Sequence, residues 1–162
     1  YEKPNNMGNM PECLADNLNE LVKINYVRIY GYERAIEELN NSDVDLRAIF
    51  SKSADTSREF ISYWQNAVRM IGGTPAMDST VRGKLFRVWM DFKATLTGSD
   101  REAILKSCLF GEEAAIRAYE EALATSSHLP DNHRQEITSQ KATIQDAHRN
   151  IEVYAKAHDV MT

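Results

Sequence analysis

Histidine and glutamate residues on helical stretches of this 162-residue chain raise the question of a carboxylate di-metal centre. In helix bundles such a centre takes a Glu from each of two helices and a Glu-x-x-His pair from each of the other two, because that spacing puts both ligands on one inward face. The residues three positions before the four histidines are Thr125, Pro130, Gln145 and Ala155. Since no Glu-x-x-His pair exists in the sequence, we expect no complete di-iron or di-manganese site, no catalytic residue and no bound cofactor.

Part of such a ligand set is nevertheless present. Glu112 and His148 fall on the apolar stripes of two predicted helices, and Glu33 and Glu113 lie beside such stripes. These four residues are the candidate ligands for a di-iron or di-manganese pair, or for a single zinc ion, if the chain binds metal. The favoured interpretation is a buried polar cluster whose hydrogen bonds fix the helix register. The cluster consists of Asn25, Tyr32, Glu112, Tyr119 and His148.

A basic and aromatic stretch lies in the middle of the chain. It contains Arg82, Lys84, Arg87 and Lys93 among Phe86, Trp89 and Phe92. A basic amphipathic helix can bind a membrane, RNA or a partner protein. Because Asp78 and Asp91 dilute the positive charge, we favour a helix that packs its aromatic side chains across the bundle and leaves its charges in solvent.

The two cysteines, Cys13 and Cys108, are too few for a disulfide scaffold, and a reducing cytoplasm is the expected compartment. Cys108 lies on a predicted core stripe, where cysteine behaves as a small apolar residue. Cys13 precedes Gly31 by 18 residues, which is about 27 Å along a helix. If Gly31 and Gly111 mark one crossing level, the two thiols are too far apart for a disulfide.

Helical periodicity dominates the elements that must position these residues. Apolar residues recur every three or four positions in five segments: 12–40, 44–71, 80–96, 100–124 and 130–158. The prolines fall between these segments, and no stretch alternates with a period of two. We therefore expect an all-α fold, with a flexible segment over 1–11 and one domain over 12–162.

Short links predict that the long segments form two helical hairpins. Asn40 to Asp43 joins the first pair and supplies an N-cap for the second helix. A long connection that contains the 80–96 segment joins the two hairpins. Two hairpins joined by one long crossover are typical of the ferritin-like four-helix bundle, with up-down-down-up topology.

A weak internal repeat relates the two hairpins. Residues 31–36 (GYERAI) and 111–116 (GEEAAI) match in Gly, Glu, Ala and Ile. A glycine inside a helix costs about 1 kcal/mol relative to alanine. Two glycines at equivalent places therefore predict a close helix approach, and a chance match between Ala- and Glu-rich helices is the alternative.

One stretch resembles the signature of a known family. It runs from Arg87 to Gly98 (RVWMDFKATLTG) and is followed by Cys108, Gly111 and Glu112. The chain resembles, over about residues 18–157, a family of small bacterial ferritin-like four-helix proteins classed as a domain of unknown function. The resemblance implies the fold and brings no settled activity with it.

Composition narrows the function classes further. The chain has 19 Lys and Arg against 24 Asp and Glu, a net charge of −5, which argues against nucleic-acid binding. No apolar run reaches the roughly 18–20 residues that span a bilayer. We therefore expect a non-catalytic structural, interaction or stress-related protein, with a second copy or another protein as its partner. The alternative is a metal-dependent redox protein that uses the candidate ligands above.

Overall fold

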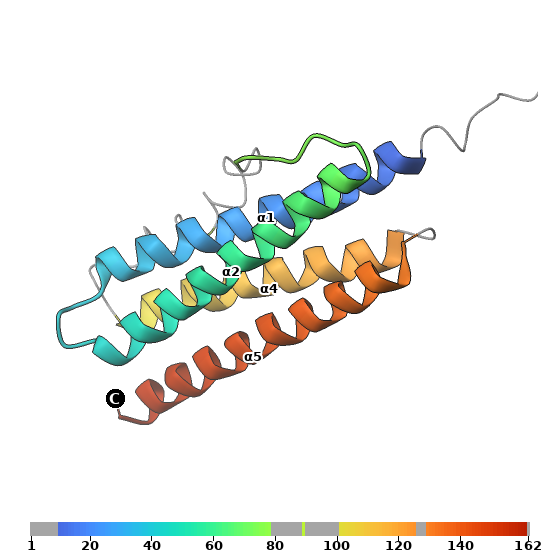
Figure 1. Cartoon of the computed structure of the whole chain (residues 1–162). Helices are drawn as coiled ribbons and strands as arrows, with labels where there is room; N and C mark the ends of the chain where they lie inside the picture. The colour runs from blue at the N-terminus through green and yellow to red at the C-terminus, as the bar shows by residue number, and fades with distance from the viewer. Residues whose placement is uncertain (1–9, 79–88, 90–100, 126–128, 162) are drawn as a thin grey trace, which may run out of the picture.

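Four long helices make up most of the structure. The computed structural model describes residues 10–78, 89, 101–125 and 129–161. Its helices are α1 (Met10–Glu38), α2 (Val44–Met70), α4 (Arg101–Thr125) and α5 (Asp131–Met161) (Figure 1). The described residues contain no strand, and the all-α prediction is confirmed. The observed helix ends differ from the expected ends by at most three residues. The expected 80–96 helix lies outside the described residues except for Trp89.

The helices form two antiparallel hairpins that pack against each other (Figure 1). α1 packs on α2, α4 packs on α5, and α1 of the first hairpin packs on α4 of the second. α2 and α4 run in the same direction, so the end of α2 and the start of α4 lie at opposite ends of the bundle. These helix directions are those of the up-down-down-up topology.

An arginine ties the start of α4 to the start of α2. Asp43 is the N-cap residue of α2, and its carboxylate accepts a hydrogen bond from the backbone N–H of Asn40 at 3.1 Å. Arg101 donates to Asp43 and to Asp45, at 2.8 Å in each case. The hydrogen bond from Arg101 lowers the pKa of Asp45. This clamp fixes the axial position of one hairpin relative to the other at one end of the bundle.

The chain leaves α2 through two glycines and then runs back along α1. Gly72 has a φ of +81°, a conformation that favours glycine, and the N–H of Gly73 bonds the carbonyl of Val68 at 2.9 Å. The side-chain amide of Asn19 then holds the following segment in both directions. It donates to the Thr74 carbonyl at 3.0 Å and accepts from the Ala76 N–H at 2.8 Å. The start of the crossover is thereby fixed on α1.

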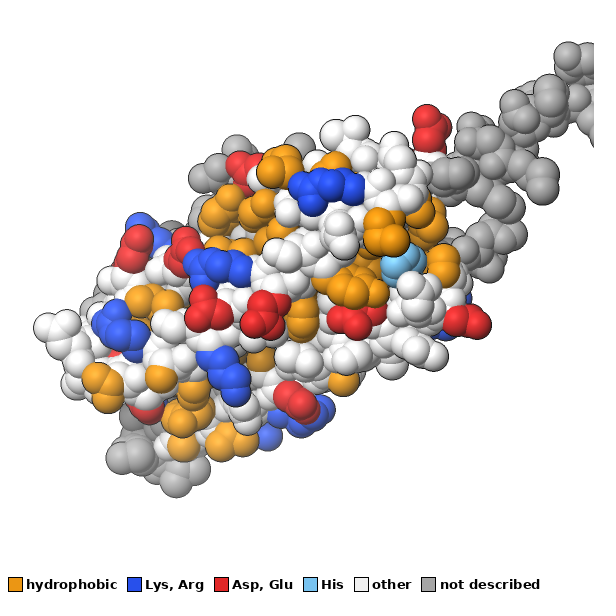
Figure 2. All heavy atoms as spheres, viewed as in Figure 1, with side chains coloured by type: hydrophobic (Ala, Val, Ile, Leu, Met, Phe, Trp, Pro, Cys, Tyr) orange, Lys and Arg blue, Asp and Glu red, His pale blue; other side chains and the backbone are white. Residues whose placement is uncertain are grey.

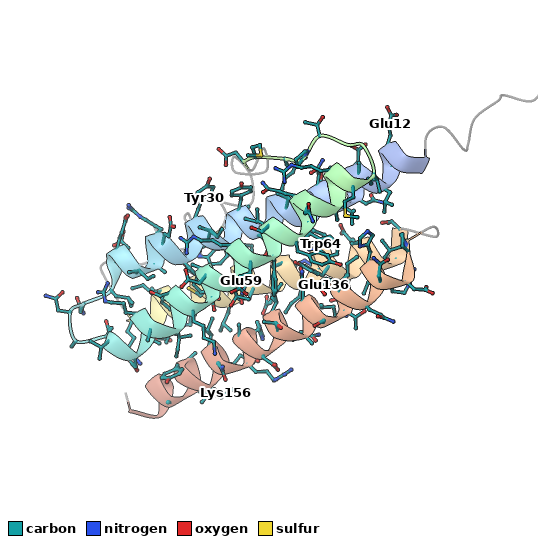
Figure 3. All side chains as sticks on the ribbon, in the orientation of Figure 1. Glu12, Tyr30, Glu59, Trp64, Glu136 and Lys156 are labelled. Carbon is teal, nitrogen blue, oxygen red and sulfur yellow. The ribbon has the colours of Figure 1, made fainter. Side chains whose placement is uncertain are left out.

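The bundle interior is mainly apolar and is completed by a few large aromatic side chains. Figure 3 shows Trp64 between α2 and α5, whereas Glu59 and Lys156 extend outward. The largest fully buried aromatic residues are Trp64, Trp89, Tyr32, Tyr119 and Phe50. On the face shown in Figure 2, basic and acidic side chains are interspersed, so that this face carries no large field of one sign.

Candidate functional site

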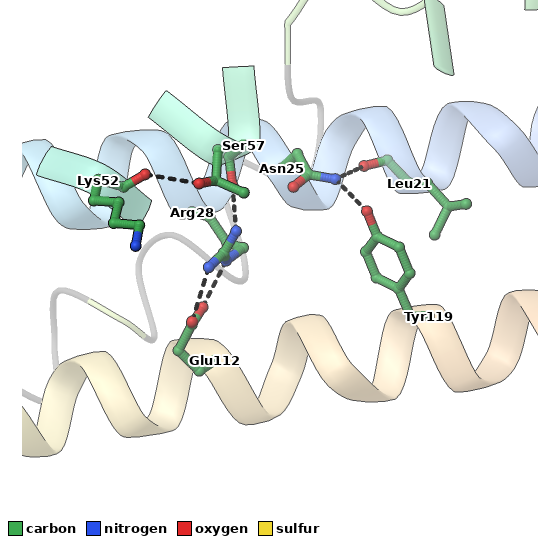
Figure 4. A network of polar contacts seen from close by, with 8 residues as sticks. Leu21, Asn25, Arg28, Lys52, Ser57, Glu112 and Tyr119 are labelled. Atoms are coloured by element: carbon green, nitrogen blue, oxygen red, sulfur yellow. Dashed lines mark hydrogen bonds and ion pairs between the residues drawn. The ribbon is translucent and has the colours of Figure 1, made fainter. Parts of the chain in front are cut away.

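An arginine occupies the centre of the bundle. Arg28 of α1 is fully buried and forms a two-point ion pair with Glu112 of α4, which is also fully buried (Figure 4). Its Nε donates to one carboxylate oxygen at 2.6 Å and its Nη2 to the other at 2.8 Å. Its Nη1 donates to the hydroxyl of Ser57 on α2 at 2.5 Å. Three helices are thus joined through one guanidinium group.

The surroundings of Arg28 keep it charged. Burial by itself lowers the pKa of the guanidinium, but the carboxylate of Glu112 outweighs burial and holds the pKa above its ordinary value. The Tyr32 ring lies 5.7 Å from the guanidinium carbon, within the range of a cation–π contact. Burial, together with the nearby Glu112 carboxylate, raises the pKa of Tyr32 well above its ordinary value, so that its hydroxyl stays neutral.

A second, uncharged network lies nearby in the bundle. Asn25 of α1 donates to the hydroxyl of Tyr119 on α4 at 2.8 Å. Tyr119 donates to the side-chain oxygen of Gln140 on α5 at 2.6 Å, and the indole N–H of Trp64 on α2 donates to the same oxygen at 2.6 Å. All four helices therefore meet in one chain of hydrogen bonds. Burial raises the pKa of Tyr119 to about 12, which keeps its hydroxyl protonated as a donor.

Among the described residues of this region, two buried polar atoms have no hydrogen-bond partner. They are the side-chain oxygen of Asn25 and the hydroxyl of Tyr32. The amide of Asn25 is oriented by its other bond, because its nitrogen also donates to the Leu21 carbonyl at 2.8 Å. An unsatisfied buried polar atom costs about 1–3 kcal/mol, so the interior tolerates a small penalty at each of these positions.

The sequence-predicted metal ligands do not converge. Glu112 faces the interior and binds Arg28, whereas Glu33 lies on the surface and pairs with Arg58 at 2.5 Å. Glu113 is exposed on α4, where His148 contacts it at 3.3 Å. Glu112 and Glu113 are adjacent in sequence, and successive residues of a helix point in different directions by about 100°. This rotation separates the buried carboxylate from the exposed one.

The expectation that His148 joins the buried polar cluster needs correction. His148 is only partly buried and lies between two carboxylates at the α4–α5 surface, with its Nε2 on Glu113 and its Nδ1 on Glu152 at 3.2 Å. Asn25, Tyr32, Glu112 and Tyr119 are all fully buried. They divide between two networks, since Glu112 pairs with Arg28 and Asn25 bonds Tyr119.

A di-metal centre of the carboxylate type does not fit the described residues that line the interior. In the described part of the chain, the buried carboxylates are Glu112 and Asp43, and Asp43 is engaged by Arg101 at the end of the bundle. Both oxygens of Glu112 accept bonds from Arg28. Within that same part of the chain, no three His, Cys, Asp or Glu side chains are grouped so as to hold a metal ion. Near the bundle centre, the described residues therefore offer a metal ion one carboxylate, Glu112, together with neutral groups.

The two repeat glycines make room for a tryptophan. A Cβ atom added to Gly111 would lie 1.9 Å from Cε3 of Trp89, and one added to Gly31 would lie 2.4 Å from its Cε2. The Trp89 side chain is buried and contacts the ring of Tyr32 edge-on at 5.4 Å between centroids. The close approach predicted at these glycines is thus made by an indole that lies between α1 and α4, not by the two helix backbones alone.

Arg28 and Gln140 are the functional residues that the sequence reasoning missed. Arg28 follows Asn25 by three positions and precedes Tyr32 by four, so helical periodicity already placed it on the inward face. Gln140 likewise lies three positions after Ile137 and four before Ile144. Helical periodicity alone therefore places both residues on the inward faces of their helices. Their polar side chains indicate the opposite, because such side chains usually lie at the surface.

Other sequence expectations meet the structure only in part. Cys13 is exposed and Cys108 is buried. The basic residues Arg82, Lys84, Arg87 and Lys93 lie outside the described residues. The described helices include none that is both long and apolar enough to cross a membrane.

Comparison with known proteins places this geometry in context. The family model described as "Domain of unknown function (DUF2383)" matches residues 14–125. None of the curated proteins matches the sequence. A point mutant of Dps1 from Mycobacterium smegmatis is similar in structure, with a TM-score of 0.78, 9% identity, and coverage of 90% of this chain and 97% of that one.

A second similar structure comes from Bacillus anthracis str. Ames and is described as ferritin-like, diiron-carboxylate proteins. Its TM-score is 0.57 at 17% identity, with coverage of 96% of this chain and 99% of that one. At these identities the likeness concerns the fold alone. The ferritin-like fold expected from the sequence is confirmed.

Proposed function

We propose that this chain, which belongs to the DUF2383 family, works as a metal-independent ferritin-like bundle with a structural or interaction role. The observation that carries the proposal is the two-point ion pair between Arg28 and Glu112 at the bundle centre. A protein cation already neutralises the buried carboxylate there. Among the described residues, the interior side chains join four helices by hydrogen bonds, and both oxygens of Glu112 are occupied by Arg28.

Charge balance supports this proposal. A di-metal carboxylate centre brings four positive charges into the interior and needs several carboxylates around them. Here one carboxylate faces one guanidinium, so that the pair is neutral. A metal ion bound to Glu112 would have to displace Arg28, and an unpaired buried guanidinium carries a large desolvation penalty.

The alternative is a metal-dependent redox protein with a non-standard site. Two observations favour it as the second candidate: a solved structure similar to this chain is described as diiron-carboxylate, and Glu113 and His148 are in contact. In that case Glu113 and His148 at the α4–α5 surface would supply two ligands, and the metal would need further ligands beyond those that the described residues group there.

Metal loading separates the two proposals. The purified protein would be incubated anaerobically with Fe(II) or Mn(II), desalted and analysed by elemental mass spectrometry. The structural proposal predicts far less than one metal ion per chain, in wild type and in Glu113→Gln and His148→Gln variants alike. About two ions per chain, lost in those two variants but kept in Glu59→Gln as an exposed control, would contradict it and support the redox protein.

A metal-independent role leaves protein association as the activity to look for. Large apolar side chains are exposed on the surface, among them Met70, Met77 and Val153. We propose a second copy of the chain or another protein as the partner. Sedimentation analysis over a range of protein concentrations measures self-association directly, and a strictly monomeric chain would direct the search to other proteins.

A further inference from the structure

The residues around the Arg28 side chain form a receptor for a guanidinium group. Glu112 offers both carboxylate oxygens along one edge, at 2.6 and 2.8 Å. The Ser57 hydroxyl accepts from the remaining terminal nitrogen at 2.5 Å. The Tyr32 ring lies 5.7 Å from the central carbon. A guanidinium is recognised by this combination of a fork-shaped acid, a neutral acceptor and an aromatic ring.

The groups that contact the guanidinium belong to residues on three helices. Glu112 belongs to α4, Ser57 to α2 and Tyr32 to α1, and each of the three is fully buried. The Trp89 indole packs beside them, because it contacts Tyr32 and lies against Gly111, the residue before Glu112. The position of the receptor groups therefore depends on the packing of the bundle as well as on Arg28.

The receptor selects against other cations by its charge and shape. One carboxylate balances one positive charge, whereas a divalent metal ion needs additional anionic ligands. An ammonium group lacks the planar fork that matches both carboxylate oxygens. A small planar monocation is the ligand class that satisfies the acid and the hydroxyl together.

We infer that the centre of this bundle is a guanidinium-binding site, which the protein fills with its own Arg28, and that shortening Arg28 leaves a site for free guanidinium ion. The inference rests on the proposed function, because both require that a protein cation and not a metal neutralises Glu112. It goes further in naming the ligand class of the site and in treating Ser57 and Tyr32 as part of its recognition.

Chemical rescue of Arg28→Ala tests the site. The variant leaves Glu112 buried without a partner, and we expect its melting temperature to fall by about 10–20 °C. Guanidinium chloride, at concentrations well below those that unfold proteins, should raise that temperature relative to the same concentration of sodium or tetramethylammonium chloride. The double variant Arg28→Ala with Glu112→Gln is the matched control, because glutamine keeps the size of the Glu112 side chain without its negative charge and should show no guanidinium-specific rise.

The outcomes of this experiment test the guanidinium site separately from the proposed metal-independent function. A rise with guanidinium in the single variant alone supports the site. Equal responses to the three salts would overturn it, and a larger rise with Mn(II) or Zn(II) would replace the guanidinium site with a latent metal site. Neither of these outcomes changes the metal content of the wild-type protein, which tests the proposed function separately.

A second measurement covers the case in which Arg28→Ala does not fold. In the wild-type protein, the guanidinium protons of Arg28 should give resolved, slowly exchanging nitrogen-15 NMR signals, because three of its N–H groups are bonded inside the bundle. Ser57→Ala should shift the terminal nitrogen signal and leave the Nε signal resolved. Arg28 signals that are averaged like those of surface arginines such as Arg58 would contradict the inference.

Discussion

Two arginine–glutamate pairs join α1 to another helix, and their surroundings make them different interactions. Arg28 and Glu112 are 1% and 0% exposed, whereas Arg58 and Glu33 are 48% and 49% exposed. The closest contacts are 2.6 Å and 2.5 Å, so that distance does not distinguish the pairs. The dielectric environment does, because water screens the surface pair and leaves each of its members solvated when the other is removed.

The same contrast between interior and surface distinguishes two carboxylates that are neighbours in the sequence. Glu112 joins the interior pair, and Glu113 contacts His148 at the surface. A charged carboxylate in the interior needs a partner of opposite charge. Arg28 of the same chain is that partner for Glu112, so that no cation from solution is required. The interior acid is therefore part of the fold, whereas the surface acids remain accessible to solvent.

Removing one arginine from each pair should give the largest contrast. Arg28→Ala leaves a buried carboxylate unpaired, and we expect it to lower the free energy of unfolding by about 3–5 kcal/mol. Arg58→Ala removes its exposed ion pairs with Glu33 and Asp55, and we expect a change of about 0–1 kcal/mol. Urea unfolding of the two variants measures both values, and similar losses would show that burial does not determine the strength of these pairs.

Replacing both members of the interior pair provides the control for that experiment. Arg28→Met combined with Glu112→Leu leaves no unpaired charge, and well-packed apolar replacements of buried ion pairs are often neutral or stabilising. The double variant should therefore be more stable than either single variant. Losses that simply add would mean that each residue acts through packing and not through the other.

The neutral network can be compared with the charged one through two tyrosines. Tyr119→Phe removes a hydroxyl that bonds both Asn25 and Gln140, and we expect a loss of about 1–3 kcal/mol. Tyr32→Phe removes a hydroxyl that makes no hydrogen bond of normal geometry, although the Glu112 carboxylate lies near it, and the ring beside Arg28 remains. That variant should be neutral or slightly stabilised in urea unfolding, and a loss as large as that of Tyr119→Phe would contradict this assignment.

A smaller net effect is expected where the repeat glycines meet Trp89. Gly111→Ala gains about 1 kcal/mol of helix propensity but places a Cβ atom 1.9 Å from the indole. Because overpacking of a core costs about 1–3 kcal/mol, we expect a net loss of roughly 1 kcal/mol in urea unfolding. Combining it with Trp89→Leu should remove the clash. A Gly111→Ala variant that is more stable than wild type would contradict the close packing of the indole on α4.

The smallest expected effect concerns the loss of folding stability at acidic pH. Burial lowers the pKa of His133, which packs edge-on against Trp64 at 5.8 Å between ring centroids. A folded-state pKa below the unfolded value means that the unfolded chain takes up the proton first, so stability falls as the pH drops below about 6.5. His133→Phe should give a shallower loss over that range in melting-temperature measurements, and an unchanged acid slope would contradict the assignment.

Helical periodicity was sufficient for the fold because long amphipathic segments and short links leave few topologies. Asp43 as a helix start and Gly72 as a stop are local signals of the same kind. The site was predicted only in part. The position of Arg28 in the helical period indicates the interior, whereas its charge indicates the surface. A pattern places a residue on an inward face, but its partner depends on which helices meet. No sequence spacing relates Arg28 to Glu112, which lies 84 residues further along the chain.

The repeat glycines illustrate a second limit. Equivalent glycines on two helices predict that another group packs closely against the helix backbone there. The sequence does not identify that group. Here the close neighbour is Trp89, a side chain from the connection between the hairpins. A helix-interior glycine is therefore evidence for a close contact, and only the tertiary structure identifies it as an indole.

Diffraction from crystals grown with Mn(II) or Fe(II) would test most directly whether Arg28 fills the centre of the bundle. Data collected at the absorption edge of the metal would locate every bound ion. We predict no anomalous peak within coordination distance of Glu112, and electron density for the Arg28 guanidinium on both carboxylate oxygens. An anomalous peak on Glu112, with Arg28 turned away, would contradict the account.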